Sequence, residues 1–374
     1  MSDTQALSGP LARRERLLAE IRELGLRAAL ISDPRHVHYL SGHRPGGKSP
    51  AFLLLRRDEK PLLVVGESEH ARVSDVGVSA YEDYSIHHLL DRRAEAARAL
   101  IEAAQRCGLA REDAVGVEAH NLPAFAQPAL GQREGLDVTA ILHSMRAVKD
   151  AQEQEAIRCS VAVARAGHAA ARQAAVAGAV EFDVYAQIQR ACVLAAGEPI
   201  AFDGDFVSGE RSWQIGGSPS HRIMRGGELF ICDLFPTVAG YWADTTRTIA
   251  VGSPTRQQLE IFDLVHAALE RGRQALRPGV LASEVYYEVR TFIADAGRAA
   301  QFPHHGGHGI GLEPHESPWI IPGDDTRLRA GMTITLEPGV YVEGVGGVRL
   351  EDNYIVTEDG AEVIEPHSLS LQVG

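Results

Sequence analysis

Two pairs of acidic residues, each placed about a short turn sequence, constrain this chain more than any other feature. Asp233 lies in the mostly apolar run 228–235, and Asp244 lies in the extended run that starts at Tyr241. The sequence Pro-Thr-Val-Ala-Gly at 236–240 between these runs predicts a hairpin. The midpoint of the two aspartates falls inside this turn, so we expect them to face each other across the hairpin, roughly 5 Å apart.

A second acidic pair, Glu337 and Glu351, has the same arrangement about the glycine-rich bend at 343–347. Both pairs adjoin apolar runs typical of buried strands, where uncompensated like charges would each cost several kcal/mol. Bound cations would remove this conflict, and His308, in a glycine-rich segment, could complete their ligand set. The five residues therefore predict two divalent cations that hold and acidify one water, which points to hydrolysis.

Arg349 lies two residues before Glu351 and therefore points to the same face of its strand. A cation beside a metal cluster has little evident structural reason to be there, so we expect Arg349 to meet an anionic group of a substrate. In a plainer interpretation, each acidic pair only forms a solvated hairpin face. The apolar runs that adjoin both pairs fit that interpretation poorly.

Four segments match recurring patterns: D-x(10)-D-x-T-R-T at 233–248, H-x(3)-H-G-x-G-x(3)-H-E at 304–316, E-P-G-x-Y at 337–341, and R-x-E-D at 349–352. In this order they resemble metallopeptidase family M24, which includes Xaa-Pro dipeptidases (prolidases) and aminopeptidases P with the pita-bread fold. The resemblance implies an α/β protein. An N-terminal creatinase/prolidase-like α/β domain would precede a pita-bread catalytic domain.

The resemblance implies that two divalent metal ions per chain bind to five side chains: Asp233, Asp244, His308, Glu337 and Glu351. In this scheme Asp244 and Glu351 bridge both ions. Asp233 binds one ion, and His308 and Glu337 bind the other. Manganese is the expected metal, with cobalt, iron and zinc as alternatives that oxygen-rich ligands do not separate.

The resemblance also implies roles for residues beside the ions. His304 and Arg349 would bind the substrate, and His315 would polarise the carbonyl of the cleaved bond. Glu337 would pass the proton of the metal-bridged water to the leaving nitrogen, whereas His305 is expected to be a bystander. These roles predict a dinuclear metal-dependent hydrolase, an Xaa-Pro dipeptidase-like exopeptidase that acts on small peptides.

One position departs from the family pattern. Relatives of this kind usually carry a histidine eight residues after the serine of a Ser-Gly pair, and the aligned residue here is Gly216. Because that histidine helps to shape the substrate pocket, two other activities on small molecules stay open, ectoine-hydrolase-like and dimethylsulfoniopropionate-lyase-like. A non-catalytic binding protein is a further alternative, which the full set of metal ligands disfavours. The 14-residue interval from Glu337 to Glu351 resembles that of dipeptidases more than that of many aminopeptidases P.

The chain is predicted to divide into domains at 1–145 and 146–374. The first alternates predicted strands and helices, which is typical of an α/β domain with a mostly parallel or mixed sheet. The second contains predicted helices at 150–178, 183–195, 257–276 and 283–296. An acidic hairpin follows each pair of these helices, which fits an internally duplicated domain.

Residues 42–49, Gly-His-Arg-Pro-Gly-Gly-Lys-Ser, match the letters of a P-loop. A P-loop needs a buried strand before it and a helix that opens at the lysine. Here the preceding run 35–40 is too polar for a central strand, and the following run 50–55 resembles a strand. We therefore expect Lys48 to lie in a mobile loop that binds no nucleotide.

Composition excludes several classes of partner. The formal net charge of −13 over 374 residues disfavours nucleic acid and anionic membranes. The sequence lacks a signal-peptide-like start and any run near the ~18 apolar residues of a membrane helix. The four cysteines form no C-x-x-C pair, which is typical of reduced thiols. We therefore expect a cytoplasmic enzyme and, by the resemblance, a homodimer.

Overall fold

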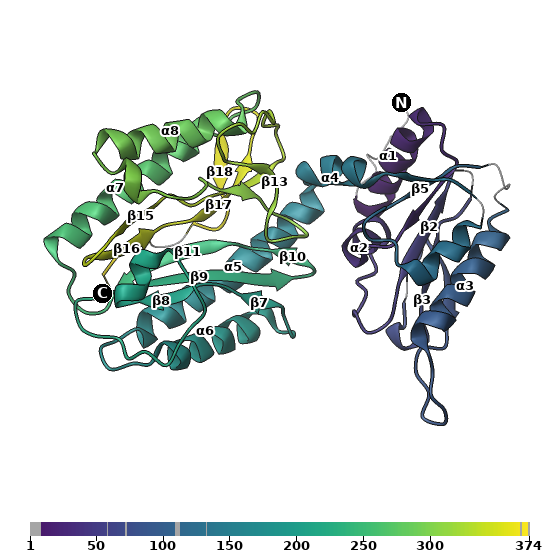
Figure 1. Ribbon diagram of the computed structural model, residues 1–374, viewed down its shortest axis with the longest axis horizontal. Coiled ribbons are helices and arrows are strands. Elements are labelled where there is room, and N and C mark those ends of the chain that lie inside the picture. The colour runs from purple at the N-terminus through teal and green to yellow at the C-terminus, as the bar shows by residue number, and fades with distance from the viewer. Residues whose placement is uncertain are drawn as a thin grey trace, which may run out of the picture. The chain divides into compact units, whose positions relative to one another are not determined.

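A computed structural model describes residues 9–57, 59–71, 73–108, 113–131, 133–366 and 369–372 (Figure 1). The chain divides into two compact units, Met1–Arg146 and Ala147–Gly374, and each has a hydrophobic core of its own. In both units helices pack on β-sheets, as expected for an α/β protein. Among the described helices, none is long and apolar enough to cross a membrane.

The first unit is built on the strands β1 (Ala28–Ile31), β2 (Phe52–Arg56), β3 (Leu62–Gly66), β4 (Gly77–Tyr81), β5 (Val115–Val117) and β6 (Gly135–Asp137). They form one six-stranded sheet in the order β4-β3-β2-β1-β5-β6. β1 pairs antiparallel with β2 and parallel with β5. The sheet is therefore mixed, which is one of the two arrangements predicted for it.

The helices of this unit are α1 (Gly9–Glu23), α2 (Pro34–Ser41), α3 (Arg92–Arg106) and α4 (Thr139–Ala147). α3 covers one face of the sheet, where its alanines pack in one cluster with Leu30 and Leu54. α1 and α2 lie against the other face (Figure 1). Because helices cover both faces, every residue of β1 is buried, which accounts for the unbroken apolar run in this strand.

The segment with the P-loop letters lacks the frame of a P-loop. α2 precedes it and ends at Gly42, whose φ of 76° is left-handed, and the strand β2 follows it. A P-loop requires the opposite order, a strand before the loop and a helix after it. The placement of Lys48 in a loop agrees with the sequence prediction.

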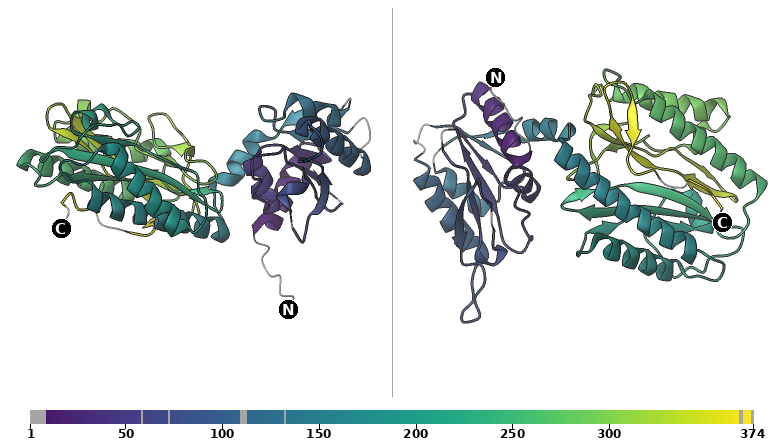
Figure 2. Two further views of the ribbon diagram at one scale, coloured as in Figure 1. Left: turned by 90° about the horizontal axis from the view of Figure 1, so that it is seen from below. Right: turned by 180° about the vertical axis from the view of Figure 1, so that it is seen from behind.

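The second unit repeats one arrangement, a pair of helices followed by strands. Its first half contains α5 (Ala151–Ala174), α6 (Glu181–Ala196), β7 (Phe202–Asp203), β8 (Phe206–Ser208), β9 (Leu229–Val238), β10 (Tyr241–Trp242) and β11 (Thr245–Ala250). Its second half contains α7 (Arg256–Ala275), α8 (Ala282–Asp295), β12 (His308–Gly309), β13 (Glu316–Trp319), β14 (Thr333–Leu336), β15 (Gly339–Val342), β16 (Gly346–Arg349), β17 (Asp352–Val356) and β18 (Ala361–Val363). The two helix pairs lie outside the strands, on opposite sides of the unit (Figure 2).

Capping residues place the ends of these helices close to their predicted positions. Asp150 begins α5 in a capping box with Glu153, and Thr255 begins α7 in a capping box with Gln258. Gly197 ends α6 with a φ of 69°, a conformation that glycine adopts without strain. The four helices predicted for this unit are confirmed.

The first acidic hairpin forms, but its predicted register is wrong. Asp233 pairs with Thr246 and not with Asp244. The turn is centred on Ala239 and Gly240, whose φ angles are 51° and 82°, as two-residue hairpin turns require. Because the shift amounts to two positions along the strand, Asp244 stays on the face to which Asp233 points.

The second acidic hairpin has its predicted register. The ladder between β15 and β16 ends at the pair of Gly339 with Arg349. β14 and β17 pair in the same register on the other side of the acidic residues. Glu337 and Glu351 lie between the two ladders and therefore oppose each other.

Candidate active site

Asp233 lies on the face of β9 that points away from the helices α5 and α6. Side chains alternate along a strand, and the neighbouring Leu234 points toward these helices, against Gly167. On the opposite face, Ile231 packs with Tyr341 of β15. Asp233 therefore faces the second half of the unit from within a buried strand.

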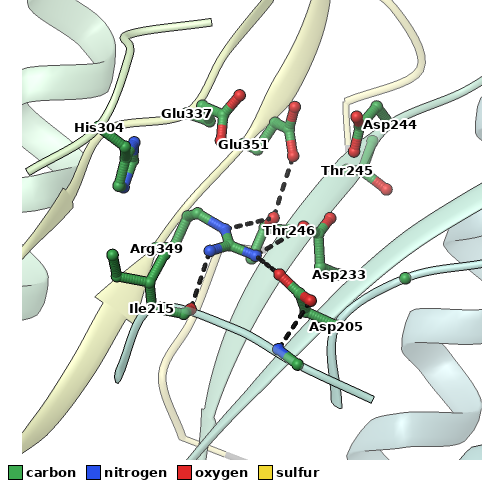
Figure 3. A network of polar contacts seen from close by, with 12 residues as sticks. Asp205, Ile215, Asp233, Asp244, Thr245, Thr246, His304, Glu337, Arg349 and Glu351 are labelled. Atoms are coloured by element: carbon green, nitrogen blue, oxygen red, sulfur yellow. Dashed lines mark hydrogen bonds and ion pairs between the residues drawn. The ribbon is translucent and has the colours of Figure 1, made fainter. Parts of the chain in front are cut away.

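Both halves contribute to one cluster of predicted ligand residues, of which Figure 3 shows Asp233, Asp244, Glu337 and Glu351. Three groups of side chains offer ligand atoms that lie within 4.8 Å of one another: Asp233, Asp244 and Glu351; His308, Glu337 and Glu351; and Asp244, His308 and His315. Asp244, Glu351 and His308 each belong to two groups, so the three groups form one continuous cluster, which fits two adjacent ions.

Several buried polar atoms of this cluster have no partner in the protein. They are Oδ1 of Asp233, Oδ1 of Asp244, Oε1 of Glu351 and Nε2 of His308, judged over the described part of the chain. Buried polar atoms without hydrogen bonds are rare in folded proteins. Their concentration here indicates a ligand, and carboxylate oxygens with one imidazole nitrogen fit divalent cations.

The orientation of His308 also fits a cation. Its Nδ1 donates a hydrogen bond to the carbonyl oxygen of Gly309 at 2.9 Å, so its Nε2 carries the lone pair. This Nε2 lies 3.5 Å from Oδ2 of Asp244 and 3.6 Å from Oε1 of Glu337. A lone pair beside two carboxylates is repelled unless a cation lies between them. Burial lowers the pKa of His308 to about 3, so the ring is neutral at pH 7, as a metal ligand must be.

Without cations, the carboxyl groups of the cluster oppose one another's ionisation. Burial, followed by the charge of Glu351, raises the pKa of Asp244 well above its ordinary value. Burial and the charge of Glu337 raise the pKa of Glu351 in the same way. Burial raises the pKa of Glu337 to about 8. Divalent cations would stabilise the ionised forms, so the residues fit the metals.

The Thr-Arg-Thr sequence of β11 joins the two halves. Oγ1 of Thr246 donates to Oε2 of Glu351 at 3.0 Å, and the buried Arg247 donates to the carbonyl oxygen of Glu351 at 2.5 Å. Oγ1 of Thr248 donates to the carbonyl oxygen of Arg349 at 2.9 Å. These bonds hold the aspartate hairpin against the glutamate hairpin. They give a structural role to the Thr-Arg-Thr sequence at 246–248 and to the R-x-E-D sequence at 349–352.

Arg349 points into the site, where the protein engages its whole guanidinium (Figure 3). Its Nη2 donates to Oδ2 of Asp233 and to Oδ2 of Asp205, each at 2.7 Å. Its other donors bond Oγ1 of Thr246 at 3.2 Å, the carbonyl oxygen of Ile215 at 3.0 Å and the hydroxyl of Tyr341 at 3.2 Å. Arg349 therefore has a structural role that the sequence did not reveal, because it compensates the negative charges of two carboxylates.

Asp205 is a residue of the site that sequence analysis missed. Its Oδ1 accepts a hydrogen bond from the backbone N–H of Gly217 at 2.8 Å, beside Gly216. A Cβ added at Gly216 would lie 2.0 Å from Oδ2 of Asp205. Asp205 lies 144 positions before Arg349, and no sequence periodicity signals a contact over such an interval.

Three histidines surround the cluster in different ways. Nε2 of His304 lies 2.8 Å from a tyrosine hydroxyl of β15, and burial lowers the pKa of His304 to about 3. His315 is exposed, and its ring centroid lies 4.3 Å from that of His308. His305, expected to be a bystander, places Nδ1 3.2 Å from Oε1 of Glu337. Nothing in the sequence, apart from its position next to His304, indicated that His305 would lie close to the Glu337 carboxylate.

Comparison with known proteins gives matches over both units. Residues 155–358, more than half of the chain, match metallopeptidase family M24. The chain belongs to metallopeptidase family M24. Residues 13–148 match the creatinase/prolidase N-terminal domain, so the M24 peptidase has the two-part organisation that the resemblance implied.

Several known M24 relatives are similar along nearly their whole length. The chain is 30% identical over 350 residues to the Xaa-Pro dipeptidase of Pyrococcus furiosus, which covers 94% of this chain and 96% of that protein. The structure of the prolidase from Pyrococcus horikoshii OT3 has 29% identity and a TM-score of 0.82, covering 96% and 99% of the two chains. The X-Pro aminopeptidase from Thermotoga maritima MSB8 has 26% identity and a TM-score of 0.83, also covering 96% and 99%.

The protein is therefore a metallopeptidase, and its family implies divalent metal ions. The predictions of the M24 family, of its α/β fold and of a peptide-bond hydrolase are confirmed. These similarities do not favour the ectoine-hydrolase-like or dimethylsulfoniopropionate-lyase-like alternatives, nor a binding protein without catalysis.

Proposed function

We propose that this M24 peptidase hydrolyses the bond before proline in small peptides. The observation that supports a dinuclear site is the set of buried ligand atoms without partners at Asp233, Asp244, His308 and Glu351. The Xaa-Pro preference is supported by relatives named Xaa-Pro dipeptidase, prolidase and X-Pro aminopeptidase.

In this proposal two divalent ions would be held by the side chains of Asp233, Asp244, His308, Glu337 and Glu351. Manganese is the proposed metal, with cobalt, iron and zinc as alternatives. When bound, the two ions supply Lewis acidity and a water whose pKa is drawn toward neutrality.

The side chains around the ions would then handle the substrate. Glu337 would take a proton from the water that adds to the carbonyl carbon of the substrate, and it would release this proton to the leaving nitrogen as the C–N bond breaks. In an Xaa-Pro bond that nitrogen belongs to a tertiary amide without N–H, so it leaves only after it is protonated. His315, exposed beside His308, orients the carbonyl oxygen of the substrate by a hydrogen bond. His304 and Arg349 line the end of the pocket that receives the proline residue.

We further propose that residues 1–145 form a creatinase/prolidase-like N-terminal domain, that residues 146–374 form the catalytic domain, and that the protein is a homodimer. A cytoplasmic location is supported by the free cysteines: Cys107, Cys159, Cys192 and Cys232. Size-exclusion chromatography with light scattering tests the dimer, which a monomeric mass at micromolar concentration would contradict.

The function is tested by incubating manganese-loaded protein with Ala-Pro, Ala-Pro-Ala, Ala-Ala, ectoine and dimethylsulfoniopropionate. We expect alanine to be released from the proline-containing peptides and little hydrolysis of Ala-Ala. Asp244→Asn should abolish the activity, whereas Asp263→Asn, the same change at an exposed position of α7, should preserve it. Turnover of ectoine or dimethylsulfoniopropionate without any peptide cleavage would overturn the proposal.

A further inference from the structure

Asp205 and Arg349 form an ion pair at the edge of the active site. Nη2 of Arg349 lies 2.7 Å from Oδ2 of Asp205 and 2.7 Å from Oδ2 of Asp233. A guanidinium has five N–H groups, and the remaining three have acceptors in Thr246, Ile215 and Tyr341. Arg349 therefore retains no N–H group for an anion of the substrate while Asp205 stays in place (Figure 3).

The position of Asp205 is fixed by its surroundings. Its Oδ1 accepts from the N–H of Gly217 at 2.8 Å, and its carbonyl oxygen accepts from the N–H of Asp233 at 2.9 Å. Its Oδ2 occupies space that a side chain at Gly216 would need, since a Cβ there would lie 2.0 Å away. The Asp205 side chain is 29% exposed, whereas that of Arg349 is 4% exposed, so the carboxylate is the more accessible member of the pair.

We propose that Asp205 is a specificity-determining residue that excludes a substrate carboxylate from Arg349. It makes the enzyme prefer substrates whose group at this end is uncharged, such as an amide or a further peptide bond. A substrate carboxylate would have to displace Asp205 from a charge-assisted hydrogen bond and then lie beside a like charge. A neutral amide meets neither penalty. The inference rests on the proposed cleavage before proline and adds the chemistry of the group that follows the bond.

The first test compares kcat/KM for Ala-Pro and Ala-Pro amide with manganese-loaded enzyme. We expect the wild type to favour the amide by about tenfold, the scale of a partly exposed charge interaction near 4 Å. Asp205→Asn keeps the shape and removes the charge, so it should raise kcat/KM for the free acid by about tenfold and alter the amide value less than threefold. Asp203→Asn, which removes the same charge at an exposed position of β7, should leave the ratio unchanged. An equal loss for both substrates in Asp205→Asn would indicate a merely structural role and overturn the inference.

A second test needs no turnover, so it separates the inference from the proposed function. Calorimetry of the manganese-loaded protein should show tighter binding of prolinamide than of proline in the wild type. Asp205→Asn should shift this ratio toward proline by about tenfold. If the wild type cleaves neither Ala-Pro compound but the binding ratio shifts, the Xaa-Pro function fails and the role of Asp205 stands. An unchanged ratio, or no binding of either compound to either protein, overturns the role of Asp205.

Discussion

Arg349 shows how one side chain can serve both stability and the site. It is 4% exposed and lies between Asp205 and Asp233, both within 2.7 Å of its Nη2. Removing one member of a buried ion pair leaves an uncompensated charge, and this is more harmful than never forming the pair. Arg349 therefore supports the orientation of Asp233, whose other oxygen faces the cluster.

We predict that Arg349→Ala lowers the free energy of unfolding by about 3–5 kcal/mol, because two carboxylates lose their cation. Chemical denaturation of the metal-free protein measures this change. The double variant Arg349→Ala with Asp205→Ala should recover part of the loss. Arg256→Ala, which removes an exposed pair with Glu260 on α7, serves as the control and should change stability by less than about 1 kcal/mol. A loss of similar size in the control would contradict the argument.

The proposed metal ligands give a second prediction at this scale. Metal analysis of the manganese-saturated protein should approach about two ions per chain, since the candidate ligand groups overlap in one continuous cluster. Asp244→Asn removes a shared ligand and should bring the content to about one ion or fewer. Asp263→Asn should retain the wild-type content. A wild-type content of one ion at saturation would refute the dinuclear arrangement.

The five residues that we propose as metal ligands could be singled out because each combines an unusual residue type with a buried run, and because the family motifs contain them. Asp205 could not be predicted in this way. Its role comes from a contact with Arg349 across 144 positions and from the absence of a side chain at Gly216. Neither fact leaves a local pattern in the sequence.

At the scale of elements, the turns of the two acidic hairpins were not equally predictable from the sequence. The second bend has glycines at its centre, so its midpoint predicted the register. In the first, Pro236 suggested the start of a turn, but β9 continues through it and pairs there with Phe202 of β7. The turn lies instead at Ala239 and Gly240. The acidic residues still share a face, because the shift is an even number of residues.

The segment at 209–217 gives a prediction about Gly216. We expect Gly216→Ala to lower the free energy of unfolding by about 1–3 kcal/mol, because the new Cβ displaces the fixed Asp205 carboxylate. In an Asp205→Ala background the same change should cost at least about 1 kcal/mol less, since contacting residues are not additive. Gly360→Ala, where a Cβ meets nothing within 4 Å, is the matched control. Additive effects of the two substitutions would show that Asp205 does not limit this position.

The loop between α2 and β2 gives a prediction about nucleotides. Because it lacks a following helix, millimolar ATP should not raise the melting temperature. A ligand at ~100 times its dissociation constant would add about 2.7 kcal/mol, which a thermal shift assay detects readily. Lys48→Ala should also preserve kcat/KM within about threefold. A stabilisation by ATP that Lys48→Ala removes would restore the P-loop interpretation.

At the scale of the whole molecule, the second unit is a duplicated framework whose halves meet at the cluster. The aspartates come from the first half, and His308 and the glutamates come from the second. The sequence predicted the repeated order of helices and hairpins, because periodicity and caps are local. It did not predict how β11 packs against β16 and β17, which depends on hydrogen bonds of Thr246, Arg247 and Thr248 over about a hundred residues. Ligand residues from both halves imply that cations stabilise the unit as a whole.

This coupling predicts that metal stabilises the protein more as the pH rises. In the metal-free fold, burial raises the pKa of Glu337 to about 8 and raises those of Asp244 and Glu351 well above their ordinary values. The unfolded chain releases the same protons near pH 4. The metal-free fold therefore binds more protons than the unfolded chain between about pH 4 and 8, so this cluster loses stability as the pH rises through that window.

Cations reverse the loss, because they favour the ionised carboxylates and are displaced by protons at low pH. The difference in melting temperature between manganese-loaded and chelator-treated protein should therefore grow from pH 5.5 to pH 8, by several degrees on the scale of about 1–2 kcal/mol. Asp244→Asn should show a smaller difference with a weaker dependence on pH. A difference that stays constant or shrinks over this range would mean that the buried carboxyl groups do not bind the metal in their ionised form.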